Sequence, residues 1–143
     1  MAFAPGQFIT AQRLNRLQNR VYFAEGGVLA ASSTNADIPS VTLTFTSETD
    51  NAIAHCWWTC DFDLSGAQTG SGTSRLLLDG ATSSTRFIAW SGEVATDRGQ
   101  PANMDSFDLG TAGSHTIKAQ ATTLANMTVG QYCALRVEVE EVV

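Results

Sequence analysis

The chain has 143 residues, which is a typical length for one domain with a sizeable hydrophobic core. Its charged fraction is only 15% and its net charge is −6, which argues against nucleic acid or an anionic membrane as the main partner. No stretch approaches the roughly 18 apolar residues of a membrane span, and the N-terminus is too polar for a secretory signal peptide. We therefore expect a protein that is made in the cytoplasm.

The first 20 residues, called the leader below, differ from the rest of the chain. They carry three arginines and no acidic residue, a charge of +3, whereas the five basic and fourteen acidic residues that follow give −9. Thr10 fits a helix N-cap, and Leu14, Leu17 and Val21 repeat at helical spacing, so the pattern predicts a short α-helix from Ala11 to about Arg20. An apolar arm precedes this helix. Because so short a helix is marginal alone in water, its apolar stripe needs a surface to pack on.

From Val21 onward the apolar residues alternate with polar ones, which is the pattern of half-buried β-strands. The clearest run is AIAHCWWTCDFDL, which predicts one long strand that buries Ala52, Ala54, Cys56, Trp58, Cys60, Phe62 and Leu64. Its other face begins with Ile53 and Trp57 and then turns acidic. We expect that face to be partly covered as well.

Further strands follow at intervals of about 10 to 15 residues. Asp79-Gly80 predicts a tight turn between two short runs. Two C-terminal strands should bury Ile117, Ala119, Ala121, Cys133, Leu135, Val137 and Val139. This rhythm is typical of an antiparallel β-sandwich, here over residues 21–143.

Three cysteines, Cys56, Cys60 and Cys133, speak against a disulfide framework, and we expect buried thiols that behave as small hydrophobic residues. Cys56 and Cys60 lie too far apart in one strand to bridge. A bridge between Cys60 and Cys133 stays open.

Catalytic chemistry finds little support in the sequence. His55 adjoins Cys56, but consecutive strand residues point to opposite faces, so the two cannot form a nucleophile–base pair. Asp61 and Asp63 share one face and could bind Ca²⁺, although two solvated carboxylates at a strand end are the more common arrangement. We predict no enzyme activity, no metal and no cofactor.

The three tryptophans are candidates for a binding surface. Trp57 and Trp90, together with Ile53, are candidates for a subunit interface, and a carbohydrate platform that includes Trp58 is the alternative.

Two stretches resemble proteins of tailed-bacteriophage particles. The leader FAPGQFITAQRLNRLQNR is similar to the N-termini of their virion proteins in Gly6, Ile9-Thr10-Ala11 and Leu14-Asn15, with Ile9 where Leu is more usual. The stretch LGTAGSHTIKAQAT with the closing strand resembles small jelly-roll-like domains of decoration proteins, head fibres and tail fibres. The resemblance implies a virion structural protein, often trimeric, without enzyme activity.

These observations predict a capsid decoration protein, located in the virion, whose partners are the major capsid protein or another virion protein and its own copies in a homotrimer. The leader would be the anchor through its apolar and basic side chains, namely Phe3, Pro5, Phe8, Ile9, Arg13, Leu14, Arg16, Leu17 and Arg20. Alternatives are a tail-fibre or tail-tip subunit and a module that binds host glycans. The helix could also fold back as a plug under its own sandwich.

Overall fold

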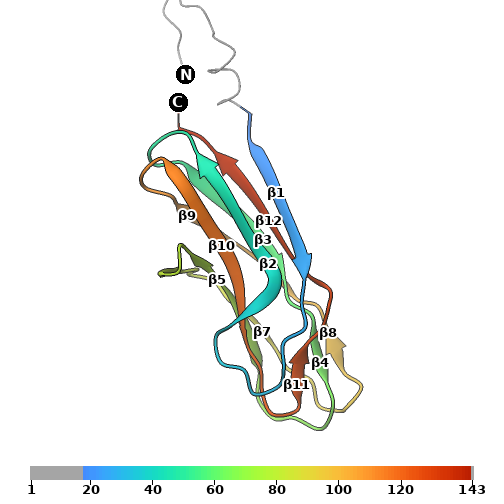
Figure 1. The fold of residues 1–143 in the computed structure, drawn as a ribbon. Helices are drawn as coiled ribbons and strands as arrows, with labels where there is room; N and C mark the ends of the chain where they lie inside the picture. The colour runs from blue at the N-terminus through green and yellow to red at the C-terminus, as the bar shows by residue number, and fades with distance from the viewer. Residues whose placement is uncertain (1–17, 143) are drawn as a thin grey trace, which may run out of the picture.

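The structure is a computed structural model that describes residues 18–142. This part of the chain contains strands and no helix (Figure 1). The strands are β1 (Arg20–Gly26), β2 (Ala36–Ser47), β3 (Ile53–Thr59), β4 (Phe62–Leu64), β5 (Gly72–Leu78), β6 (Thr82–Ser83), β7 (Ile88–Trp90), β8 (Arg98–Gly99), β9 (Ala102–Asp108), β10 (Gly113–Thr122), β11 (Met127–Val129) and β12 (Cys133–Glu140).

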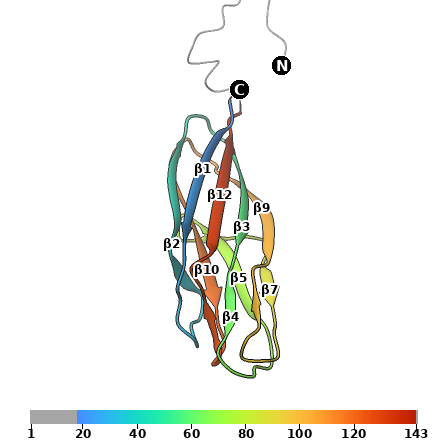
Figure 2. The ribbon, with the colours of Figure 1, turned by 90° about the vertical axis from the view of Figure 1, so that its right-hand side faces the viewer.

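Two antiparallel sheets form the two layers of a β-sandwich (Figures 1 and 2). The four-stranded sheet has the order β1-β12-β3-β9, and the five-stranded sheet has the order β2-β10-β5-β6 with β7 also paired to β5. A three-stranded sheet, β11-β4-β8, lies at one end of the molecule (Figure 1). At the opposite end β1 begins and β12 ends. The predicted antiparallel sandwich is confirmed.

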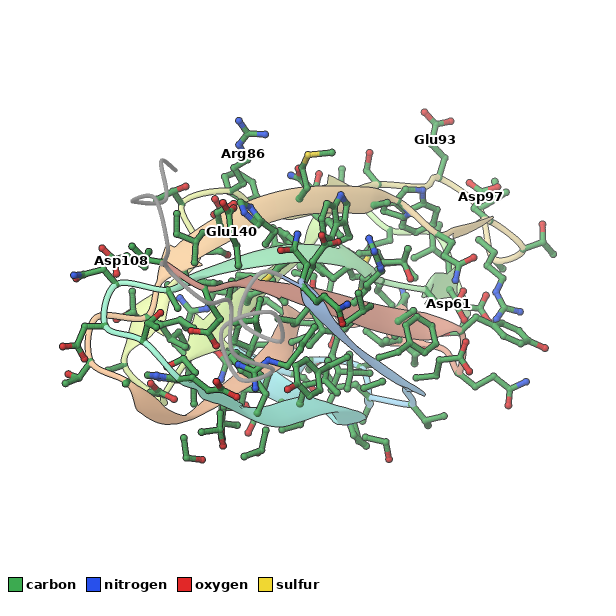
Figure 3. All side chains as sticks on the ribbon, turned by 90° about the horizontal axis from the view of Figure 1, so that it is seen from above. Asp61, Arg86, Glu93, Asp97, Asp108 and Glu140 are labelled. Carbon is green, nitrogen blue, oxygen red and sulfur yellow. The ribbon has the colours of Figure 1, made fainter. Side chains whose placement is uncertain are left out.

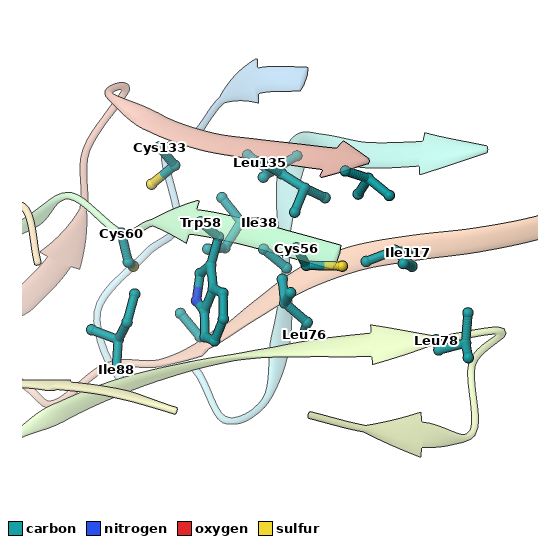
Figure 4. Packing of buried hydrophobic residues seen from close by; sticks show 14 of the residues in the cluster. Ile38, Cys56, Trp58, Cys60, Leu76, Leu78, Ile88, Ile117, Cys133 and Leu135 are labelled. Atoms are coloured by element: carbon teal, nitrogen blue, oxygen red, sulfur yellow. The ribbon is translucent and has the colours of Figure 1, made fainter. Parts of the chain in front are cut away.

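The core lies between the two layers and follows the alternation of the sequence (Figure 4). Every residue predicted to be buried in the run from Ala52 to Leu64 is at most 2% exposed, and the residues predicted to be buried in β10 and β12 are at most 1% exposed. Trp58 fills the centre of this core, and its indole N–H donates to Ser74 Oγ at 3.3 Å. The buried ring therefore has a partner for its polar atom.

Two predicted elements differ from the structure. The helix prediction for Ala11–Arg20 lies almost wholly outside the described residues, but its last residue, Arg20, is the first residue of β1. Val21 likewise belongs to the strand. The predicted long strand breaks after Thr59, and Phe62 restarts it in the three-stranded sheet, because Cys60 and Asp61 leave the ladder and Cys60 N–H donates to the carbonyl of Pro101 at 3.1 Å.

The Asp79-Gly80 turn is confirmed. Both residues have positive φ, 49° for Asp79 and 71° for Gly80, which is the left-handed backbone that a tight hairpin turn requires. The turn joins β5 to the two-residue β6.

The end of the sandwich where β1 begins is held by a buried carboxylate. The side chain of Glu141 is 1% exposed, and it accepts hydrogen bonds from the N–H groups of Glu48 and Thr49, both at 2.9 Å. Arg20 Nη2 completes the site with an ion pair. Burial raises the pKa of Glu141, but these donors outweigh it and the pKa lies below its ordinary value.

The three cysteines are buried free thiols, as predicted. Burial raises the pKa of Cys56 to about 12. Cys60 and Cys133 flank the paired residues Thr59 and Ala134, and their mutual hydrogen bond and burial raise the pKa of Cys60.

Candidate interaction surface

The outer face of the four-stranded sheet carries a row of large side chains that crosses all four strands. Phe23 on β1 lies opposite Arg136 on β12, Arg136 opposite Trp57 on β3, and Trp57 opposite Met104 on β9. We call these four residues the cross-strand row. Its two ends are the most exposed members, with Phe23 57% and Met104 51% exposed.

The row borders a shallow hollow of about 460 Å³. Thr59, Ala102 and Ala134 are small and form one side of it, so the larger side chains stand above their neighbours. Arg86 also lines the hollow, next to Met104. A large apolar side chain of a partner would find both space and contact area here.

One member of the row is already engaged within the chain. The guanidinium carbon of Arg136 lies 4.8 Å from the centroid of the Trp57 ring, which is a cation–π contact, and Arg136 Nη2 pairs with Glu138 at 2.9 Å. Arg136 therefore covers one face of the indole. Trp57 retains the partial exposure of a half-buried interface aromatic residue.

Acidic and polar groups surround the row. His55 Nε2 lies 3.0 Å from Glu140 Oε2, and His55 Nδ1 lies 2.9 Å from Ser106 Oγ, at the end of the sheet where β1 begins. Glu25, on β1 near the other end of the face, is exposed. The row therefore has the composition of a protein–protein interface, where aromatic residues, methionine and arginine are enriched and a polar rim surrounds them.

The three residues expected at a subunit interface do not lie together. Ile53 and Trp57 lie on the outer face of the four-stranded sheet, both partly exposed. Trp90 belongs to β7 in the five-stranded sheet, stacks on Phe62 with 5.9 Å between ring centroids, and packs against Gly99, where no Cβ would fit. Sequence reasoning missed Phe23, Met104 and Arg136 as members of this surface. For Arg136 a signal exists, because its position between the buried Leu135 and Val137 places its side chain on the outer face.

Of the predicted anchor residues, only Arg20 lies within the described part of the chain, where its ion pair joins β1 to Glu141. Phe3, Pro5, Phe8, Ile9, Arg13, Leu14, Arg16 and Leu17 lie outside the described residues.

Asp61 corrects a prediction, because it is not solvated. It is 1% exposed, and Arg98 binds it with two hydrogen bonds of 2.8 and 2.6 Å. The hydrogen bonds from Arg98 hold the pKa of Asp61 below its ordinary value, although burial opposes the shift. The Asp61 carboxylate therefore has a structural role. It binds β8 to the segment where the predicted long strand is interrupted after β3. Asp63 stays partly exposed, and residues 18–142 contain no group of three or more His, Cys, Asp or Glu side chains arranged for a metal ion.

Three polar residues far apart in the sequence meet at the end of the five-stranded sheet. His115 Nδ1 lies 2.9 Å from Asp79 Oδ2, and His115 Nε2 lies 3.2 Å from Ser47 Oγ. This is the order of groups in a serine hydrolase triad. Ser47 is only 2% exposed, however, and the carbonyl of Thr111 lies 3.1 Å from the same Nε2. A substrate could not reach the hydroxyl without opening this end, so the constellation acts as a polar clamp on three chain segments.

Comparisons with known proteins assign no family. No family model and no curated protein matches the chain. Among solved structures, the chain is similar to dimeric latent PorU from Porphyromonas gingivalis (8% identity, TM-score 0.46, 86% of this chain and 13% of that one). It is also similar to the CBM35 module of Abf62 from Cellvibrio japonicus (10% identity, TM-score 0.38, 81% and 92%) and to an enzymatically active domain of tailspike protein 4 from bacteriophage CBA120 (10% identity, TM-score 0.28, 84% and 19%). All these TM-scores are below 0.5, so the similarities carry no argument about function.

No membrane-spanning helix occurs between residues 18 and 142.

Proposed function

We propose that the chain is a structural protein of a virion, a small β-sandwich that acts through protein–protein contacts and catalyses no reaction. The observation that carries the proposal is the cross-strand row, which leaves Phe23 and Met104 more than half exposed at opposite edges of one sheet. Isolated exposed apolar residues are common, but a row with a hollow beside it is typical of an interaction site. The resemblance of the leader to phage virion proteins supports the virion as the setting.

In finer terms, we infer a jelly-roll sandwich in a capsid decoration protein. The strand orders β1-β12-β3-β9 and β2-β10-β5-β7 support this, since among these eight strands the chain crosses between the two sheets at every step except from β5 to β7, as it does in a double Greek key. The leader would anchor the protein to the major capsid protein or another virion protein, and the sandwiches would associate as a homotrimer. A tail-fibre or tail-tip subunit is the second possibility within the virion.

Glycan binding is the competing function, and the geometry of Trp57 disfavours it. A sugar ring stacks on an open aromatic face, whereas the guanidinium of Arg136 occupies one face of this indole at 4.8 Å. Trp90 is packed between Phe62 and Gly99. Both tryptophans are therefore poorer platforms than the sequence suggested.

Immunogold labelling of the purified particles of the virus that encodes the chain tests the proposal, with antibody raised against residues 18–142. Even labelling of the head is expected for a decoration protein, with hundreds of copies per particle by quantitative mass spectrometry. Labelling confined to the tail, with few copies, would favour the fibre or tail tip. Particles free of the protein would overturn the virion assignment.

A further inference from the structure

The outer face of the four-stranded sheet ends in two open edges. Among the described residues, β1 pairs only with β12 and β9 only with β3, so each has one unpaired side. An edge strand is a common site for another chain. On β9 the N–H groups of Met104 and Ser106 already donate to Asn103 Oδ1 and Asp105 Oδ1, at 2.8 and 2.9 Å, so a partner at this edge would be held mainly by side-chain contacts. The cross-strand row runs from one of these edges to the other, with Phe23 at the first and Met104 at the second.

The two edges carry opposite charges that lack partners. Glu25 is exposed on β1, two residues from Phe23, and Arg86 is exposed beside β9, where it lines the same hollow as Met104. Within residues 18–142, neither side chain makes a hydrogen bond or an ion pair. Figure 3 shows the Arg86 side chain extending away from the ribbon beside β9. Beside the cross-strand row, β1 thus offers an apolar side chain with a carboxylate, and the β9 edge offers an apolar side chain with a guanidinium, while Asp105 and Asp108 also lie on β9.

Phe87 does not add to this surface. Its carbonyl accepts a hydrogen bond from Asn103 Nδ2 at 2.9 Å, which holds its backbone next to β9, but Phe87 lines a different hollow, with Arg75 and Gln120 on the five-stranded sheet. The surface that could receive an aromatic ring and a carboxylate together is therefore made by Met104 and Arg86.

We propose that the occupant of this surface is a second copy of the chain. The β1 edge of one copy lies against the β9 edge of the next, where Phe23 contacts Met104 and Glu25 pairs with Arg86. The contact is heterologous, because two different edges meet, and a heterologous contact closes into a ring when the rotation allows it. This inference deepens the proposed function. It rests on that function in one respect, because it assigns the subunit contact that the proposed homotrimer requires.

The strand directions agree with such a ring. All pairs in the sheet are antiparallel, so β1 and β9 run in opposite directions and would again be antiparallel across the contact. With the ring axis along the strands, Trp57 and Arg136 of every copy would face the shared axis. The beginnings of all β1 strands would then lie at one end of the ring, so the leaders would emerge together toward a common partner.

Sedimentation velocity of the purified full chain at tens of micromolar tests the contact. The wild type should sediment as a closed oligomer, and Glu25→Arg or Arg86→Glu alone should weaken association by at least about tenfold, since each places like charges together. The double variant Glu25→Arg/Arg86→Glu should recover most of the association. Glu93→Arg is the matched control, because Glu93 is an exposed carboxylate in a loop and its reversal should leave association unchanged.

Circular dichroism and the thermal midpoint establish that each variant is folded. A monomeric wild type, single reversals without effect, or a double variant that fails to recover would each overturn the proposed contact. A dimer with two-fold symmetry would also overturn it, because such a contact joins the same surface of both copies. These results come from purified protein, so they are independent of whether the protein labels virus particles.

Discussion

The guanidinium of Arg136 lies 4.8 Å above the Trp57 ring, in the middle of a sheet face that is otherwise open to a partner. The contact orients the indole and blocks one of its faces. We expect host cell-wall glycans to leave the tryptophan fluorescence of the protein unchanged, because the ring face of Trp57 that Arg136 covers cannot stack on a sugar. A saturable change that Trp57→Ala abolishes, in a variant that remains folded, would place glycan binding ahead of a protein contact.

The ion pair of Asp61 and Arg98 should contribute substantially to stability. Asp61→Asn removes a charge that accepts two hydrogen bonds from Arg98 and leaves a buried group less well satisfied, so we expect a loss of about 2 kcal/mol in the free energy of unfolding. Urea denaturation followed by tryptophan fluorescence measures it.

Asp63→Asn is the matched control for this variant. Asp63 is the same residue type two positions along, but it is partly exposed and its side chain makes no hydrogen bond or ion pair within the described chain, so its change should stay within about 0.5 kcal/mol. Equal losses in the two variants would show that the buried pair has no special role.

Stability should fall at acidic pH. The pKa values of Asp61 and Glu141 lie below their ordinary values of 3.8 and 4.5, so the folded state holds both carboxylates ionised where the unfolded state begins to bind protons. The stabilisation is complete above the unfolded pKa values and is lost as the pH falls through the folded ones. A thermal midpoint followed from about pH 7 to about pH 3 should therefore drop mainly below about pH 4.5, and Asp61→Asn should flatten the drop. An unchanged slope in that variant would exclude Asp61 as a contributor.

The clamp of Ser47, His115 and Asp79 should be inert toward serine-directed reagents. Because Ser47 is 2% exposed, a fluorophosphonate probe should not label the native protein. Ser47→Ala should lower stability by about 1 kcal/mol through the lost hydrogen bonds at this end. Stoichiometric labelling of wild type that Ser47→Ala removes would mean that the triad geometry is functional, and the chain would then be an enzyme.

Local pattern predicted the sandwich because its core is set by alternation. Each inward position of β12, from Cys133 to Val139, can be identified from its neighbours two residues away, and Asp79-Gly80 specifies its turn by backbone preference alone. Side-chain contacts between segments far apart in the sequence could not be predicted from this local pattern. Ser47 and His115 are 68 residues apart, and the partner of Asp61 is 37 residues further along, so nothing near either residue distinguishes a buried carboxylate from a solvated one.

The cross-strand row was also predicted only in part, because its members come from strands far apart in the sequence. Trp57 was identified as an interface candidate from its own strand, but its neighbours Arg136 and Met104 come from register between strands far apart in the chain. Trp90 looked equivalent to Trp57 in the sequence, and only the packing against Gly99 and Phe62 separates the two.

The structure defines where the leader can be removed without damage to the sandwich. Arg20 belongs to β1 and pairs with the buried Glu141, so a deletion of residues 1–20 would remove part of the sandwich as well as the anchor. We expect the loss of Arg20 to cost about 1 to 3 kcal/mol, since it leaves a buried carboxylate short of a donor. Deletion of residues 1–17 should instead leave the thermal midpoint almost unchanged.

The shorter deletion should nevertheless abolish attachment to particles in a co-sedimentation assay. It removes five large apolar side chains, each worth roughly 1.5 to 3 kcal/mol if fully buried against a partner; these are Phe3, Phe8, Ile9, Leu14 and Leu17. Leu14→Asp with Leu17→Asp in the full chain should mimic the deletion, whereas Arg16→Ala should weaken attachment only modestly and more at high salt. If the chain without residues 1–17 still decorates particles at wild-type occupancy, the sandwich carries the attachment site and the leader does not.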